Sequence, residues 1–144
     1  MRPVHDIADL AARLEGLAED FSGAGPFVTV HAPAAASLTP EVREAAYLIA
    51  AEAVHNAVRH AGASRIDIEL VEARPGVARL SIADDGAGFD PHTASGVGTA
   101  SMRERASGAG ASLDLSSTPG LGTTVAVEFD ARQPAGAGSK GVNR

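Results

Sequence analysis

The sequence predicts an α/β fold: a two-layer α/β sandwich whose sheet is mixed and mostly antiparallel, with helices on one of its faces. Three observations predict it. The chain has 144 residues, which suits a single domain with one modest core. Segments with apolar residues at every third or fourth position are interspersed with segments that alternate apolar and polar residues. Short turns containing glycine join the alternating segments in pairs, as they do in antiparallel hairpins.

Two helices and one strand are expected in the first 62 residues. The first helix spans residues 4–21, and the glycines and proline that follow it end it. A short strand over residues 27–31 comes next. Thr39 is a suitable N-cap for the second helix, because Pro40 follows it at a position where a missing N–H costs nothing. This helix should run to about residue 60 and end at Gly62.

Four strands and a third helix are expected after it. Each strand alternates apolar residues with polar ones, and a turn at Pro75-Gly76 joins the first two. The expected elements are strands 65–71 and 77–84, a glycine-rich loop over 85–97, a helix over 99–107, and strands 113–116 and 123–129.

The composition excludes several classes of function. A net charge of −6 argues against DNA or an anionic membrane as a bulk partner. The chain has no cysteine, so disulfides and sites built on thiolates are ruled out. It also has no apolar run of about 18 residues, which argues against a membrane span.

One face of the second helix carries a polar stripe. It spans about 100° of the helix and consists of Glu52, Asn56, Arg59 and His60. Asparagine is an unfavourable residue in mid-helix, and a carboxylate with an amide oxygen one turn apart suits Mg²⁺ or its waters. Arg59 and His60 could then meet phosphate oxygens. The alternative is an ordinary solvated helix face.

Two adjacent acids end the strand over residues 77–84. Alternation turns Asp84 toward the core and Asp85 outward. A carboxylate on the buried side needs a donor, and Gly86 and Gly88 would let a ligand approach the backbone. An amino group on a planar heterocycle fits, which favours adenine over guanine by about 1.5–3 kcal/mol. An ordinary Asp-Asp-Gly turn is the alternative.

Two further glycine segments point to the same site. Gly96 and Gly98 precede the last helix, where accessible backbone amides would bind an anion such as the ATP phosphates. This is not a P-loop, because the P-loop pattern is absent from the chain. Gly122 leads into Thr123, whose side chain should face inward and share a pocket with Asp84. A plain glycine hairpin is the alternative.

The order and spacing of these motifs resemble the Bergerat-type ATP-binding domain shared by gyrase, the Hsp90 chaperone, histidine kinases and MutL. The motifs are Glu52-x-x-x-Asn56-x-x-Arg59-His60, Asp84-Asp85-Gly86-Ala87-Gly88, Gly96-Val97-Gly98 and Gly122-Thr123. Two further segments resemble the sensor histidine kinases that act on NarL-type response regulators. They are Met102-Arg103-Glu104-Arg105-Ala106 and Pro119-Gly120-Leu121-Gly122-Thr123-Thr124-Val125.

The resemblance implies a role for each residue. Glu52 would polarise the attacking nucleophile or accept its proton, and Asn56 would hold Mg²⁺ against the triphosphate. Asp84 would take the adenine amino group, with Thr123 joining through water. The remaining expected contacts are Arg59 and His60 with the phosphates, Gly86 and Gly88 along the base pocket, and Gly96 and Gly98 closing a lid, residues 90–98, over the phosphates.

Two features depart from the family's pattern. Thr99 and Ser101 stand where the family usually has leucine and glycine, and a side chain at Ser101 would cap the helix or crowd a phosphate. The family's phosphoacceptor lies on an upstream helical hairpin, for which this chain has no room. His5-Asp6 only superficially echoes the acceptor dipeptide.

The resemblance implies that this is the catalytic domain of a two-component sensor histidine kinase. It would bind Mg·ATP and donate the γ-phosphoryl to a histidine on a separate phosphoacceptor domain, which would serve a NarL-type response regulator. Residues 1–37 would form the linker-proximal part, 38–129 the catalytic core and 130–144 a disordered tail.

We expect this segment in the cytoplasm, alone or as the cytoplasmic portion of a membrane-bound sensor, with no contact to nucleic acid or membrane. Two other functions stay open at this point. One is a stand-alone anti-sigma-factor serine kinase of the same superfamily. The other is a binding module with a degenerate site.

Overall fold

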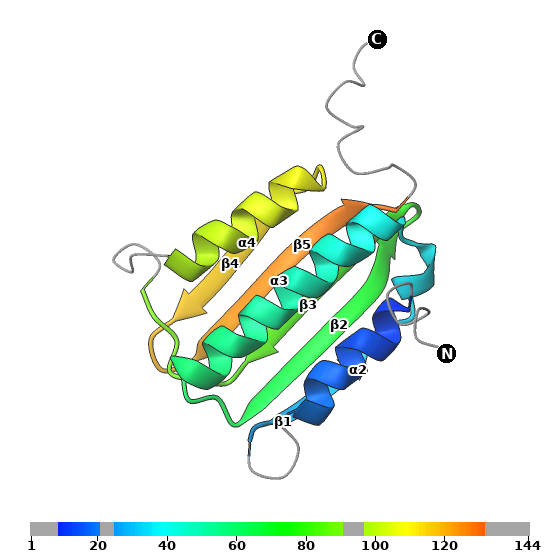
Figure 1. Cartoon of the computed structure of the whole chain (residues 1–144). Helices are drawn as coiled ribbons and strands as arrows, with labels where there is room; N and C mark the ends of the chain where they lie inside the picture. The colour runs from blue at the N-terminus through cyan, green and yellow to red at the C-terminus, as the bar shows by residue number, and fades with distance from the viewer. Residues whose placement is uncertain (1–8, 21–24, 91–96, 132–144) are drawn as a thin grey trace.

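The computed structural model describes residues 9–20, 25–90 and 97–131 (Figure 1). The elements in chain order are α2 (Leu10–Asp20), β1 (Phe27–His31), the 3-10 helix η1 (Ala35–Ser37), α3 (Pro40–Arg59), β2 (Arg65–Arg74), β3 (Val77–Asp84), α4 (Val97–Gly108), β4 (Leu113–Thr118) and β5 (Gly122–Asp130). No helix within these ranges is long and apolar enough to cross a membrane.

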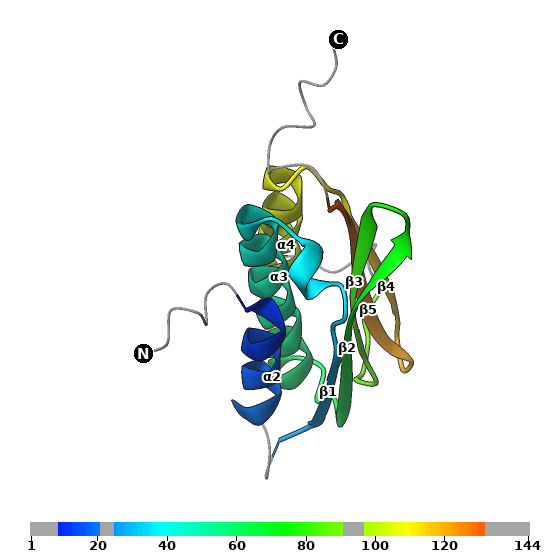
Figure 2. The same ribbon diagram turned by 90° about the vertical axis from the view of Figure 1, so that its right-hand side faces the viewer.

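The strands form one five-stranded sheet in the order β1-β2-β3-β5-β4. Strand β1 pairs with β2 in parallel, and every other pair is antiparallel. Helices α2, α3 and α4 all lie on one face of this sheet (Figure 2). The predicted two-layer α/β sandwich with a mixed, mostly antiparallel sheet is therefore confirmed.

The core lies between the helices and the sheet. Strand β2 contributes Ile66, Ile68 and Leu70, each at most 1% exposed. The buried face of α3 consists largely of alanines, and these small side chains let the helix lie close to the sheet. The buried side chains of α2 are Leu10, Leu14 and Leu17.

Helix α3 begins and ends where the sequence predicts. The Thr39 hydroxyl accepts a hydrogen bond from the Val42 backbone N–H at 3.3 Å, and Pro40 opens the helix. His60 is the C-cap, and Gly62 leaves the helix with a φ of +61°. Because only glycine adopts such a φ readily, the chain turns here toward β2.

Several elements are longer than the sequence pattern indicated. Strand β2 runs to Arg74, because its pairing with β3 continues through an irregularity between Glu72 and Arg74. Strand β4 runs to Thr118, which pairs with Gly122. Helix α4 begins at Val97.

Two predictions fall partly outside the described residues. The first helix was expected over 4–21, and the structure describes it over Leu10–Asp20. The disordered tail was expected over 130–144, but Asp130 is the last residue of β5, and residues from 132 onward lie outside the described residues.

Candidate functional site

The elements that carry most of the residues singled out by the sequence meet at one end of the sandwich. The last turn of α3, the end of β3, the start of α4 and the β4–β5 turn meet there (Figure 1). The Ala87 backbone N–H donates to the Ala61 carbonyl at 2.9 Å, and the Gly120 N–H donates to the Ala87 carbonyl at 2.6 Å. The loop after β3 is thereby held between the α3–β2 connection and the β4–β5 turn.

Asp84 and Thr123 face each other across this end of the sheet. They are direct partners in the β3–β5 register, and alternation places both on the helix-covered face. The Gly86 backbone N–H donates to Asp84 Oδ1 at 2.7 Å. Desolvation by burial nonetheless raises the pKa of Asp84. The carboxylate is thus a partly buried acceptor.

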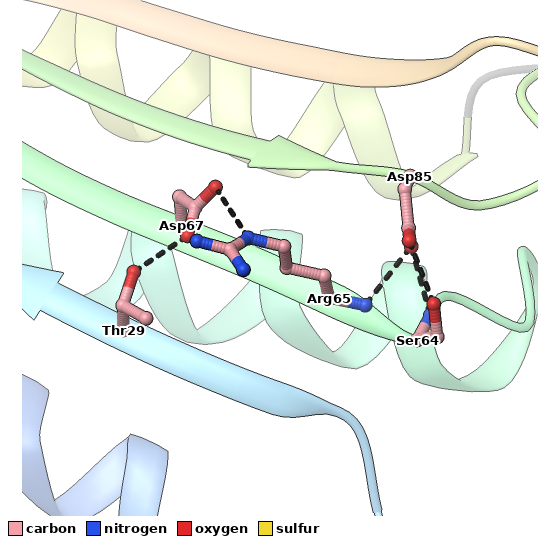
Figure 3. A network of polar contacts seen from close by, with 5 residues as sticks. All are labelled: Thr29, Ser64, Arg65, Asp67 and Asp85. Atoms are coloured by element: carbon pink, nitrogen blue, oxygen red, sulfur yellow. Dashed lines mark hydrogen bonds and ion pairs between the residues drawn. The ribbon is translucent and has the colours of Figure 1, made fainter.

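Asp85 has a different role from its neighbour, as Figure 3 shows. Its Oδ1 accepts the backbone N–H groups of Ser64 at 2.8 Å and Arg65 at 2.9 Å, and its Oδ2 accepts the Ser64 hydroxyl at 2.6 Å. These bonds, first of all the one from the Ser64 side chain, lower the pKa of Asp85. The second acid therefore fastens the end of β3 to the start of β2.

The same figure shows a second carboxylate on the outward face of β2. The Thr29 hydroxyl donates to Asp67 Oδ1 at 2.6 Å, and Arg65 Nε lies 3.3 Å from Asp67 Oδ2 (Figure 3). The bond from Thr29 lowers the pKa of Asp67. These contacts join β1 to β2 on the face of the sheet that the helices do not cover.

The glycines of the loop bring protein segments together. A Cβ at Gly86 would lie 2.5 Å from the Ala61 Cβ. Gly88 has a φ of +68°, and a Cβ there would run into the Thr118 carbonyl oxygen. The sequence predicted close approach of a ligand at these positions. The structure shows that the close approach is first of all between strand ends and loops of the chain itself.

The polar stripe borders the buried face of α3. Glu52 and Asn56 are half-buried, whereas Arg59 and His60 are exposed. Neither the Glu52 side chain nor the Asn56 side chain has a hydrogen bond or an ion pair with the part of the chain that is described. Both side chains can therefore take a ligand without losing a bond to this part of the protein.

No hydrogen bond or ion pair within the described residues joins the side chains of the stripe to Asp84. Helix α3 packs against both β3 and α4. Ala61, which directly follows the stripe, contacts Gly86 and Ala87. The stripe is thus connected through Ala61 to the loop after β3, residues 85–90, which we call the pocket loop.

The stripe fits a magnesium ion that arrives with a phosphate compound. Mg²⁺ prefers oxygen ligands and commonly takes one or two from the protein and the rest from phosphates and water. The amide oxygen of Asn56 is such a ligand, with the Glu52 carboxylate one turn away. Among the described residues no group of three or more His, Cys, Asp or Glu could hold a metal ion.

Gly98 lies in the first turn of α4, because the helix begins at Val97. The sequence predicted Gly98 just before the helix. The first four N–H groups of a helix have no partner within the helix, and the Gly98 N–H is one of them. Gly96 lies outside the described residues, as do residues 91–96 of the lid expected over 90–98.

Ser117 is a site residue that the sequence reasoning missed. Its Oγ lies 2.9 Å from the Phe89 backbone N, 3.2 Å from the Gly122 carbonyl oxygen and 2.8 Å from Thr123 Oγ1. The signal that could have found it is alternation: Leu113 and Leu115 face inward, so a serine two positions later is a polar residue on the inward face.

This chain is similar to known proteins in sequence and in fold. A family model described as Histidine kinase-, DNA gyrase B-, and HSP90-like ATPase matches residues 41–133. The sensor histidine kinase MctS of Rhizobium johnstonii is 40% identical over 74 residues, which are 48% of this chain and 16% of MctS. The nitrate/nitrite sensor protein NarQ of Escherichia coli is 41% identical over 80 residues, 54% of this chain and 14% of NarQ.

A longer match is to the sensor protein VraS of Staphylococcus saprophyticus, 30% identical over 121 residues, which are 83% of this chain and 35% of VraS. The chain thus spans about a third or less of these relatives. The histidine kinase domain of the Erythrobacter litoralis EL346 blue-light activated kinase has the same fold, with a TM-score of 0.69 and 20% identity over 88% of this chain and 62% of that one. The ATP binding domain of PrrB from Mycobacterium tuberculosis superposes with a TM-score of 0.63 and 22% identity over 90% of this chain and 96% of that one.

Proposed function

The chain belongs to the histidine kinase-, DNA gyrase B-, and HSP90-like ATPase family, and we propose that it is the ATP-binding catalytic domain of a two-component sensor histidine kinase. In this proposal it binds Mg·ATP and donates the γ-phosphoryl to a histidine on a separate phosphoacceptor domain. The observation that carries the proposal is the pairing of Asp84 with Thr123 at the end of the sheet.

Asp84 would recognise the adenine base. A carboxylate can only accept hydrogen bonds when ionised, so it would take the exocyclic amino group of adenine and repel the carbonyl oxygen that guanine has there. The partial burial of Asp84 increases this preference for adenine, because a hydrogen bond to a charged group is stronger where water competes less. Gly86 and Gly88 would line the base pocket beside it.

The end of α3 would hold the triphosphate. Arg59, the last residue of the helix, and its C-cap His60 are exposed and would contact the phosphates. Asn56 would hold Mg²⁺, which neutralises phosphate charge when it is bound. Backbone N–H groups at the start of α4, including that of Gly98, would contribute further donors, and Gly96 would belong to a lid over the phosphates.

Glu52 would act on the nucleophile. In the transfer, a ring nitrogen of the acceptor histidine forms a bond to the γ-phosphorus, and the bond from that phosphorus to the β,γ-bridging oxygen breaks, so that ADP leaves. Glu52 would polarise the imidazole or accept its proton. The Glu52 side chain is available for this role, because it is half-buried and unpaired within the described residues.

The partner would be a phosphoacceptor helical hairpin, in the same full-length protein or on another chain, followed by a NarL-type response regulator. The segments Met102–Ala106 and Pro119–Val125 support this subfamily by their resemblance. NarQ and the other relatives are sensors, and by analogy the segment would work in the cytoplasm. Residues 38–129 would then be the catalytic core.

Nucleotide binding followed by phosphoryl transfer tests the proposal. We expect an ATP analogue to bind the chain more tightly with Mg²⁺ than without it, and Asp84→Asn to weaken binding at least tenfold, since a charge-assisted bond is lost. Asp85→Asn is the matched control, because Asp85 bonds Ser64 and Arg65 instead of facing the pocket. Unchanged affinity in Asp84→Asn would refute the adenine assignment.

In the second step, γ-labelled ATP is added to the chain alone and then with a supplied helical-hairpin domain. We expect label only on the hairpin, in the acid-labile form typical of phosphohistidine. Strong self-labelling of the chain would contradict the proposal. Copurification of the chain with a sigma factor would support the serine kinase alternative instead.

A further inference from the structure

We propose that Ser117 sets the direction of the Thr123 hydroxyl and so makes Thr123 an acceptor in the base pocket. Ser117 would then be a positioning residue that determines which purine the pocket prefers. The inference rests on the proposed function, because it concerns how a bound nucleotide is chosen.

Only one placement of the hydroxyl protons makes all three contacts of Ser117 Oγ hydrogen bonds. The Phe89 backbone N–H can only donate, and the Gly122 carbonyl can only accept. A serine hydroxyl has one proton and two lone pairs. The Ser117 hydroxyl therefore donates its proton to the Gly122 carbonyl, and one of its lone pairs accepts the Phe89 N–H. The remaining lone pair must take the proton of the Thr123 hydroxyl, which lies 2.8 Å away.

This arrangement decides what Thr123 offers to a ligand. Having given its proton to Ser117, the Thr123 oxygen has only lone pairs left. Its register partner Asp84 is also an acceptor when ionised, and both lie on the helix-covered face. A group that touches both residues, directly or through a water, must therefore donate. The amino group of adenine does so, and the carbonyl oxygen of guanine does not.

Ser117 also anchors the pocket loop through Phe89. Loss of this bond would weaken the binding of both nucleotides together. The orientation of Thr123, by contrast, changes the ratio between them. The ratio of ATP to GTP affinity is therefore the measurement that separates a positioning role from a purely structural one.

The test is competitive binding of ATP and GTP, each with Mg²⁺, to the full chain and its variants. Ser117→Ala frees the Thr123 hydroxyl to donate inward, so we expect the preference for ATP to fall about three- to tenfold, the value of one neutral hydrogen bond. Ser117→Thr keeps a hydroxyl at the same position and should keep the preference. The matched control is Ser116→Ala, because Ser116 is exposed and points to the opposite face of β4.

A double-mutant cycle with Thr123→Val completes the test. Thr123→Val removes the hydroxyl and should itself reduce the preference for ATP. In that background Ser117→Ala should leave the ratio unchanged, because there is no hydroxyl to orient. If Ser117→Ala does not fold, as judged by circular dichroism, Thr123→Val alone decides, and an unchanged ratio in it would overturn the inference.

The failures of the two proposals are distinguishable. If the wild-type chain binds neither nucleotide, the proposed function fails, and this inference fails with it. If the wild-type chain prefers ATP and folded Ser117→Ala keeps that preference while both affinities fall equally, only the role of Ser117 is overturned.

Discussion

At the scale of single residues, two adjacent carboxylates end up with opposite pKa shifts. Burial raises the pKa of Asp84, whereas hydrogen bonds from Ser64 and Arg65 lower the pKa of Asp85. The cause is the alternation of β3, which turns one side chain toward the helices and the other outward. Asp84, on the helix-covered face, is thus available to a ligand, whereas Asp85 binds the backbone at the start of β2.

The raised pKa of Asp84 predicts how nucleotide affinity depends on pH. Because the ionised form takes the amino group, ATP affinity should fall with decreasing pH around a midpoint above 3.8, the ordinary value for aspartate. Calorimetric titration of the chain with the ATP analogue, repeated at several pH values between 4 and 8, measures this affinity. A midpoint at or below the ordinary value would contradict the assignment, and Asp84→Asn should remove the dependence.

The same shift predicts the sign of a stability effect. Between the unfolded and the raised folded pKa, the folded state binds more protons, so Asp84 lowers the free energy of unfolding as pH rises through this window. Asp84→Asn should therefore not lower the melting temperature at neutral pH. A clear loss of thermal stability in this variant would show that the carboxylate is structural.

Asp85 should behave in the opposite way. Its lowered folded pKa means that its contribution to stability is present above pH 3.8 and is lost as pH falls through the folded value. Asp85→Ala should lower the melting temperature at pH 7, and the difference from wild type should shrink toward pH 3. Asp114→Ala is the control, since Asp114 is exposed on β4. A pH-independent difference would refute the role of the carboxylate.

At the scale of elements, the glycines at the strand ends are positions of contact between segments. Gly88 and Gly122 have φ values of +68° and +95°, and a Cβ on either would meet a backbone carbonyl of the neighbouring segment. The loop after β3 and the β4–β5 turn are therefore packed on each other in a way that only glycine permits. This packing would set the shape of the proposed base pocket.

Replacing one of these glycines should unfold the site end of the sandwich. We expect Gly88→Ala to lower the free energy of unfolding by more than about 2 kcal/mol, from the left-handed backbone and the clash together. Urea unfolding measures the change. Gly16→Ala is the control: it lies within α2 with open space around it, and it should raise stability by about 0.5–1 kcal/mol. Equal effects at the two positions would contradict this account.

At the scale of the whole molecule, the first helix belongs to the same layer as the other two. Leu10, Leu14 and Leu17 of α2 are buried against the core. Arg13 Nη1 lies 2.9 Å from Glu44 Oε1, and its guanidinium stacks 3.8 Å from the centroid of the Tyr47 ring. Helix α2 thus covers the β1 side of the sheet and is joined to α3.

This packing predicts that α2 is required for the stability of the domain. Leu14 is 0% exposed, so Leu14→Ala should cost about 2–5 kcal/mol of unfolding free energy. Leu121→Ala is the control, because Leu121 is 78% exposed and its replacement should change stability by less than about 0.5 kcal/mol. Two separate transitions for Leu14→Ala in denaturant, with unchanged stability of the remainder, would show that α2 is a detachable linker.

Much of the fold was predictable because it depends on local patterns. The cap formed by Thr39 and Pro40, the alternation of β2 and β3, and the glycine turns each act over a few residues. Element ends were less predictable. Strand β4 extends to Thr118 because it pairs with the start of β5, and that pairing joins residues through tertiary structure.

The sequence by itself determined the order of helices and strands, the inward direction of Asp84 and Thr123, and the polar stripe on α3, since these follow from the periods of helix and strand. Tertiary structure decided what the periods cannot express. It brought Ser117 to the Thr123 hydroxyl, turned Asp85 into an anchor for β2, and packed Gly88 against Thr118. The physical reason is that hydrogen bonds and close contacts between distant segments depend on register and loop paths, which only the assembled sheet defines.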